Sequence, residues 1–270
     1  MHSTSSISKI SDLFVTKSSK RFIAYLTAGD PSLAVTGKFV LSLQKSGVDL
    51  IEVGLPYTDP IADGPTNIQA AERALRNPID LEQILVAIGG WREQGLKIPV
   101  LIFTYWNLIL QFGVEKFAQK AQACGVQGVL FVDLPPEEAD GVLPILEKHQ
   151  QQTVFLCSPT TSEERLKKIN QSSTGFVYYV SRAGVTGART ELVNTLAEDL
   201  QRIRKHITKP IAVGFGISTP QQAQQVASLA EGVIVGSALV SLIEKWGHEP
   251  DKACAEIEKW TTQMVQAVKG

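Results

Sequence analysis

Short apolar runs recur along the whole chain, and each is followed by a turn signal and then by a stretch with helical spacing. Such runs, bounded by Gly, Pro, Asp or Ser, are typical of strands that are buried on both faces. The predicted strands are Arg21–Thr27, Leu50–Val53, Pro99–Tyr105, Val129–Val132, Thr153–Cys157, Phe176–Val180, Ile211–Val213 and Val233–Val235. Strands that alternate with helices in this way predict a parallel α/β sheet.

The number of these strand–helix units predicts how the sheet is arranged. Eight units in a chain of 270 residues match a (β/α)8 TIM barrel, which takes ~250 residues. A six-stranded doubly wound sheet is the alternative, and eight consecutive units favour the barrel. We also expect an extra N-terminal helix at about Ile7–Thr16 and an extra helix near the end at Lys252–Val268. No linker interrupts the chain, so residues 1–270 are predicted to form a single domain.

Composition and charge narrow the class of protein. A formal net charge of −1 gives no electrostatic reason to expect nucleic acid or an anionic membrane as a partner. The three cysteines are widely spaced and do not form a metal-binding pattern, so reduced thiols are the expectation. No apolar run approaches the ~20 residues of a membrane span, and the first residues lack the features of a signal peptide. We therefore expect a cytoplasmic protein.

Carboxylates interrupt one of the apolar strands and the loop after it. Glu52 lies inside Leu50–Val53, and Asp59 and Asp63 lie in the Gly/Pro-rich loop that follows. A carboxyl group in an apolar strand has a raised pKa, which suits it to moving protons near pH 7. In a (β/α)8 barrel the active site forms at the carboxyl ends of the strands. Glu52 and Asp63 are therefore candidate catalytic residues, whereas Asp59 and Asp30 precede prolines and can equally be turn residues.

Glycines follow the predicted strands at the other side of the same barrel mouth. Gly214–Gly216 follows the seventh strand, Gly236–Ser237 follows the eighth, and a helix is expected from Ala238. Barrels often bind phosphate with these two loops and a helix N-terminus, where glycine lets backbone N–H groups approach an anion. With Gly184 and Gly187 on the sixth loop, the pattern favours a phosphate site over ordinary turns.

Two kinds of chemistry have no support in the sequence. No lysine lies at the end of a predicted strand, which argues against a Schiff-base aldolase. The four histidines fall in tails or at helix ends, so no metal site is expected.

These residues resemble one family, the α subunit of tryptophan synthase. The matching segments are Thr27–Pro31, Glu52–Pro65, Ser181–Gly187, Gly214–Ser218 and Gly236–Ala238. The resemblance implies a (β/α)8 barrel that cleaves indole-3-glycerol phosphate, reversibly, to indole and glyceraldehyde 3-phosphate. It also implies an α2β2 heterotetramer in which the β subunit binds pyridoxal phosphate and receives the indole, with no cofactor in this chain.

The resemblance implies roles for individual residues. Glu52 corresponds to the glutamate that carries a proton to C3 of the indole ring, and Asp63 to the aspartate that binds the indole N–H. Tyr25 and Phe103 correspond to positions that hold the indole. Thr186 corresponds to a loop residue that contacts Asp63 on closure. The residues that correspond to the phosphate end are Gly187, Gly216, Gly236 and Ser237, with Tyr178 and Phe215 near them.

The chain departs from the family pattern in two places. The segment after Asp63 is one residue longer, at Asn67, and Trp106 replaces a smaller residue, either narrowing the site mouth or packing outside it. Two other functions stay open at this point. One is a regulatory subunit that binds the ligand and activates the β partner but turns over poorly. The other is a different phosphate-binding barrel enzyme, such as an isomerase or epimerase.

Overall fold

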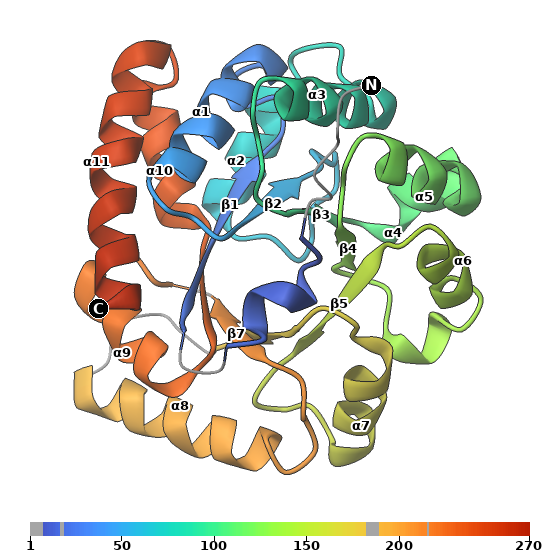
Figure 1. Ribbon diagram of the computed structural model, residues 1–270, viewed down its shortest axis with the longest axis vertical. Coiled ribbons are helices and arrows are strands. Elements are labelled where there is room, and N and C mark those ends of the chain that lie inside the picture. Colours follow the sequence, from blue (N-terminus) through green and yellow to red (C-terminus); the bar gives the residue numbers. More distant parts are fainter. Residues whose placement is uncertain (1–7, 17–18, 182–188, 215) are drawn as a thin grey trace.

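The structure is a computed structural model that describes residues 8–16, 19–181, 189–214 and 216–270, with no side-chain detail for residues 189–194. Eight parallel strands close into a barrel in sequence order (Figure 1), which confirms the predicted (β/α)8 class. The strands are β1 (Arg21–Thr27), β2 (Leu50–Gly54), β3 (Val100–Thr104), β4 (Gly128–Phe131), β5 (Gln152–Cys157), β6 (Val177–Val180), β7 (Ile211–Gly214) and β8 (Gly232–Val235). Each predicted strand is present, with ends that shift by at most one residue.

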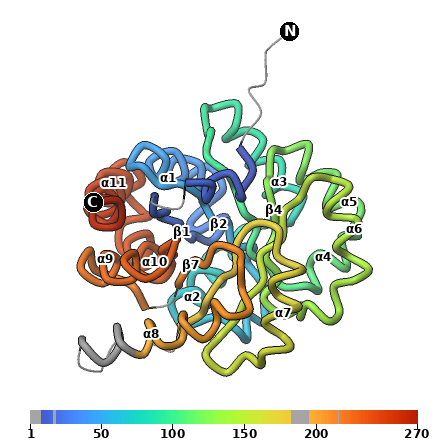
Figure 2. The backbone as a smooth tube through the Cα atoms, turned by 60° about the horizontal axis from the view of Figure 1, so that its bottom comes forward, coloured from blue at the N-terminus to red at the C-terminus, as the bar shows by residue number. Residues whose placement is uncertain are grey.

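Helices surround the barrel on all sides (Figures 1 and 2). They are α1 (Leu33–Lys45), α2 (Pro65–Ala74), α3 (Leu81–Glu93), α4 (Trp106–Phe112), α5 (Val114–Ala123), α6 (Leu143–Lys148), α7 (Glu163–Ser172), α8 (Arg189–Ile203), α9 (Pro220–Leu229), α10 (Ser237–Trp246) and α11 (Pro250–Lys269), with two 3-10 turns, η1 (Ser11–Phe14) and η2 (Pro136–Glu138). Their apolar faces pack on the outward side chains of the strands in one continuous core. Among the described helices, none has the length and apolarity that crossing a membrane requires.

The inside of the barrel is filled by side chains in layers. Near the amino ends of the strands, one buried cluster contains Ile23, Leu50, Leu101, Leu130, Val154, Phe176, Ala212 and Ile234. Ile10, just before η1, and Phe14, its last residue, join this cluster. The η1 helix lies across that end of the barrel (Figure 1). The helix predicted at about Ile7–Thr16 is present in the described part as a shorter, four-residue 3-10 helix, Ser11–Phe14. Together with Ile10 just before it, this short helix is enough to insert both apolar side chains.

The next layer lies toward the carboxyl ends of the strands. Because side chains two residues apart on a strand point to the same face, Tyr25, Glu52 and Phe103 follow Ile23, Leu50 and Leu101 into the interior. Tyr25 and Glu52 are paired neighbours on β1 and β2. The strand register therefore places aromatic and acidic groups together at the mouth of the barrel.

Candidate active site

Glu52 is the most deeply buried carboxyl group of the mouth layer. It is 1% exposed, and neither carboxyl oxygen has a hydrogen-bond partner among the residues that the structure describes. Burial without a partner disfavours the charged form, and it raises the pKa of Glu52 to about 8. At neutral pH this group therefore holds its proton and faces the barrel interior.

Aromatic side chains form the walls around Glu52. Tyr25 and Phe103 meet edge to face, with ring centroids 5.2 Å apart, and Tyr178 lies in the same interior layer on β6. Burial is the main cause that raises the pKa of both tyrosines, and the charge of Glu52 adds to it. These phenols stay protonated and can donate hydrogen bonds inside the mouth.

Two glycines make room for these tyrosines. A Cβ added at Gly54 would lie 2.3 Å from the Tyr25 hydroxyl, and one added at Gly214 would lie 2.2 Å from the Tyr178 hydroxyl. Contacts this close are forbidden to real side chains, so both strand ends need glycine. The glycines of β2 and β7 thus shape the site as well as the backbone.

Asp63 is held at the rim of the mouth by two polar side chains. The Tyr105 hydroxyl donates to Asp63 Oδ2 at 2.9 Å and accepts from the Ala62 N–H at 3.0 Å, and the Asn67 side chain also bonds the carboxylate. Burial raises the pKa of Asp63, while the bonds from Tyr105 and Asn67 act in the opposite direction. The carboxylate is therefore oriented before any ligand arrives.

Sequence reasoning did not assign these supporting roles. Tyr105 was placed only at the end of strand three, and Asn67 only as an extra residue. In the structure Asn67 belongs to the first turn of α2, which begins at Pro65 without a break. A polar residue four positions after Asp63, facing back from a helix start, is the signal that could have identified it.

Backbone groups line the opposite side of the mouth. Gly236 is the residue before α10, and no side chain caps this helix end within the described residues. A Cβ at Gly236 would lie 3.4 Å from the Tyr25 ring, so this loop adjoins the aromatic wall. Gly216 has φ +75°, a left-handed conformation that favours glycine. The first N–H groups of α10, from Ser237 on, have no carbonyl partner within the helix, which suits them to binding an anion.

Three predicted site residues lie outside the described residues. They are Thr186, Gly187 and Phe215. The structure therefore brings together Tyr25, Glu52, Phe103 and Tyr178 in the interior layer, with Asp63 at its rim and Gly216, Gly236 and Ser237 in the seventh and eighth loops.

The remaining candidates take structural places. Asp59 is exposed, whereas Asp30 is 2% exposed and binds Arg73 of α2 through both carboxylate oxygens, at 2.9 and 2.8 Å. Trp106 packs edge to face on Phe131 with ring centroids 5.3 Å apart, in the outer core between barrel and helices. Of its two predicted placements, packing outside the mouth is the one observed.

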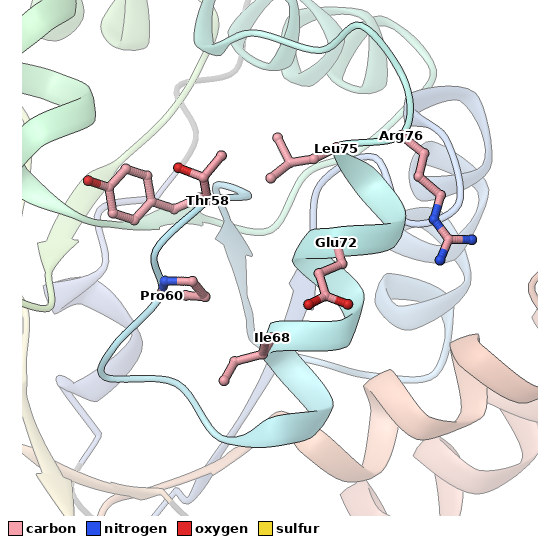
Figure 3. A pocket seen from close by; sticks show the side chains of 7 residues that line it. Thr58, Pro60, Ile68, Glu72, Leu75 and Arg76 are labelled. Atoms are coloured by element: carbon pink, nitrogen blue, oxygen red, sulfur yellow. The ribbon is translucent and has the colours of Figure 1, made fainter.

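A pocket of about 300 Å³ lies beside the loop after β2, on the side of α2 (Figure 3). It is lined by Tyr57, Thr58, Pro60, Ile68, Glu72, Leu75 and Arg76, so it contains neither Glu52 nor Asp63. No group of three or more potential metal ligands occurs in the part of the chain that the structure describes.

Comparison with known proteins gives one consistent result. Residues 13–269 match the family model described as "Tryptophan synthase alpha chain". The protein of that name from Geotalea uraniireducens is 47% identical over 227 residues, covering 84% of this chain and 85% of the relative. The one from Gloeobacter violaceus is 42% identical over 99% of this chain and 97% of its own length.

Solved structures agree with the sequence comparison. Tryptophan synthase subunit alpha from Legionella pneumophila superposes with a TM-score of 0.88 at 37% identity, covering 96% of each chain. A chain from the Pyrococcus furiosus tryptophan synthase α2β2 complex superposes with a TM-score of 0.83 at 39% identity, covering 92% of this chain and 98% of that one.

Proposed function

Because the chain belongs to the tryptophan synthase alpha chain family, we propose that Glu52 and Asp63 perform the family's chemistry at the mouth of this barrel. The chain catalyses the α reaction of tryptophan biosynthesis, the retro-aldol cleavage of indole-3-glycerol phosphate to indole and glyceraldehyde 3-phosphate. The observation that carries the residue assignment is the unpartnered Glu52 carboxyl, 1% exposed and facing the barrel interior.

Glu52 is proposed to move the proton that makes cleavage possible. The reaction needs a proton on C3 of the indole, so that this carbon can leave with the electrons of the C–C bond. A carboxyl group with a pKa of about 8 arrives protonated at pH 7 and can give up that proton. The resulting carboxylate then accepts the proton of the side-chain hydroxyl as the aldehyde forms, which restores Glu52.

Asp63 is proposed to stabilise the charge that cleavage creates. Protonation of C3 leaves a positive charge on the indole nitrogen, and a fixed carboxylate bonded to that N–H stabilises it only along the reaction path. Tyr105 and Asn67 already orient this carboxylate. Tyr25 and Phe103 would hold the ring between the two acidic groups.

The phosphate end is proposed to lie at the seventh and eighth loops. Gly216, Gly236 and Ser237 would bind phosphate oxygens through backbone N–H groups, aided by the N-terminus of α10. Tyr178, Thr186, Gly187 and Phe215 would complete this end, as the family resemblance implies.

The assembly is proposed from the family as well. We expect an α2β2 complex in the cytoplasm, in which the β subunit carries pyridoxal phosphate and this chain needs no cofactor of its own. The face of the barrel mouth offers exposed apolar side chains for such a contact, since Ile61 is 82% exposed and Leu110 is 56% exposed.

One substitution tests the assignment of Glu52. Glu52→Gln keeps the shape of the side chain and removes its proton, so cleavage of indole-3-glycerol phosphate should fall by about 10²–10⁴-fold while ligand binding persists. Indole release is measured with and without β subunit. A variant with wild-type turnover would contradict the proton-transfer role, and a wild-type complex that releases no indole would favour the regulatory alternative.

A further inference from the structure

Arg73 of α2 is hydrogen-bonded to two other elements, the loop after β1 and helix α10. It lies in the last turn of α2 and donates to Asp30 in the loop after β1, from Nε at 2.9 Å and from Nη2 at 2.8 Å. Its Nη1 donates to Glu244 Oε1 of α10 at 3.1 Å. The guanidinium is planar and uses separate N–H groups for each bond, so it fixes the direction of both carboxylates.

The ion pair between Arg73 and Asp30 is buried, whereas the one between Arg73 and Glu244 is partly exposed. The Asp30 side chain is 3% exposed and that of Arg73 is 21% exposed, whereas Glu244 is half exposed. The Asn77 side chain adds a bond to the Pro31 carbonyl at 2.9 Å. Removing one member of a buried pair leaves the other charge uncompensated, so α2 is held tightly to this loop.

Helix α10 meets the same loop. A Cβ at Gly247, where α10 ends, would lie 3.3 Å from Pro31. About one helical turn before Arg73 and Glu244, Ala70 of α2 and Val240 of α10 pack on Tyr25. The two helices thus lie side by side against β1 (Figure 2). Near their carboxyl ends they are joined by the hydrogen bonds of Arg73 to Asp30 and Glu244, which we call the clasp.

Both helices begin at the site. Asp63 lies two residues before α2, and Ser237 opens α10. Arg73 and Glu244 lie roughly 10–12 Å along their helices from these starts, at 1.5 Å per helical residue. A tilt of about 5° at the clasp would move a helix start by about 1 Å, a displacement that can cost about 10²-fold in rate.

We infer that Arg73 is a positioning residue that, through Asp30 and Glu244, sets the separation between Asp63 and the Gly236–Ser237 end of α10. This inference rests on the proposed function, in which the two ends bind the indole and the phosphate of one substrate. The affinity for a ligand that spans both ends depends on their separation, whereas the affinity for a ligand that occupies only one end does not.

The test compares ligands of two lengths on the full chain. The long probe is a non-cleavable analogue with an indole joined to a phosphate by three carbons, and the short probe is glycerol 3-phosphate. Arg73→Lys keeps the charge but cannot make the three directed bonds. This substitution should weaken binding of the long probe by about tenfold or more, and binding of the short probe by less than about twofold.

Arg204→Lys is the matched control. Arg204 also binds both oxygens of a carboxylate, Glu231, at 2.7 and 2.9 Å, but just before β8 at the opposite end of the barrel. This variant should leave the affinity for both probes unchanged. Thermal unfolding of each variant shows whether it is folded. If Arg73→Lys does not fold, Glu244→Ala replaces it in the test, because this change is at an exposed position. It should weaken binding of the long probe in the same way, but by a smaller factor.

The outcomes separate the inference from the proposed function. Equal weakening of both probes by Arg73→Lys, or no weakening of the long probe, would overturn the positioning role. A wild-type chain that binds neither probe would overturn the proposed site itself.

Discussion

At the scale of single residues, Glu52 and Asp63 are carboxyl groups whose pKa values are set by different neighbours. Burial alone raises the pKa of Glu52 to about 8, whereas hydrogen bonds from Tyr105 and Asn67 offset part of the burial effect at Asp63. Two carboxyl groups with diverging environments suit one to donate a proton and the other to remain an anion.

The pH profile of cleavage should reflect both groups. If protonated Glu52 is the active form, kcat/KM should decline as pH rises through about 8, where this group ionises. Tyr105→Phe removes a bond that lowers the pKa of Asp63, so the acidic limb should move to higher pH. Steady-state rates measured from pH 5 to 10 check both limbs, and a profile that stays flat beyond pH 9 would exclude Glu52 as the acid.

Glu52 should also make stability depend on pH. The folded chain holds the Glu52 proton up to about pH 8, whereas the unfolded chain releases it above about 4.5. The folded state therefore binds more protons between these values, and stability falls as pH rises through this window. Relative to wild type, Glu52→Gln should gain free energy of unfolding across the window, by roughly 5 kcal/mol at most. Urea unfolding at pH 5 and pH 9 measures the difference, and an equal difference at both values would contradict it.

At the scale of elements, the strand ends combine a large side chain on one strand with a glycine on the next. Tyr25 lies against Gly54 of β2, and Tyr178 lies against Gly214 of β7. The shape of the mouth thus depends on pairs of neighbouring strands, and a side chain at either glycine would require the paired tyrosine to move.

Gly214→Ala tests this dependence. The new methyl would overlap the Tyr178 ring, so the substitution should destabilise the chain by about 1–3 kcal/mol and reduce cleavage by displacing Tyr178. Gly90→Ala in α3 is the control, because nothing lies within 4 Å of its added Cβ, and its stability should stay equal or rise. Thermal unfolding and indole release report both effects. A Gly214→Ala variant as stable and active as wild type would show that Tyr178 can move freely.

Helices and strands could be predicted from the sequence where the local pattern of apolar and polar residues determines them. The apolar runs identified every strand because strands buried on both faces are apolar along their length. The bonds from Tyr105 to Asp63 and from Arg73 to Asp30 join residues that are 42 and 43 positions apart, and only the closed barrel brings them together. The N-terminal helix was predicted to be too long, because only Ser11–Phe14 of its described residues is helical, as a 3-10 helix. The role of each site residue and the single-domain organisation stay predictions.

At the scale of the whole molecule, the barrel mouth joins the site to a surface suited to a partner. The loop after β2 contacts the start of α4 through the stacked rings of Tyr57 and Tyr105, whose centroids are 4.9 Å apart. The Asn107 side chain adds a hydrogen bond, donated to the Tyr57 hydroxyl at 3.4 Å. A partner that contacts α4 would therefore also act on the loop that carries Asp63.

A pair of surface substitutions tests whether the β subunit binds there. Leu110 on α4 and Val86 on α3 are both apolar and both 56% exposed, but only Leu110 lies on the helix that follows β3 at the mouth. An aspartate at an apolar contact loses buried area and places a charge in the interface, so Leu110→Asp should weaken β-subunit binding by about tenfold or more. Val86→Asp should leave it unchanged. Titration of each variant with β subunit, followed by indole release, gives the affinity and the activation together. Equal affinities for the two variants would place the β contact elsewhere, whereas selective loss in Leu110→Asp would connect the partner surface to Asp63 through Tyr57 and Tyr105.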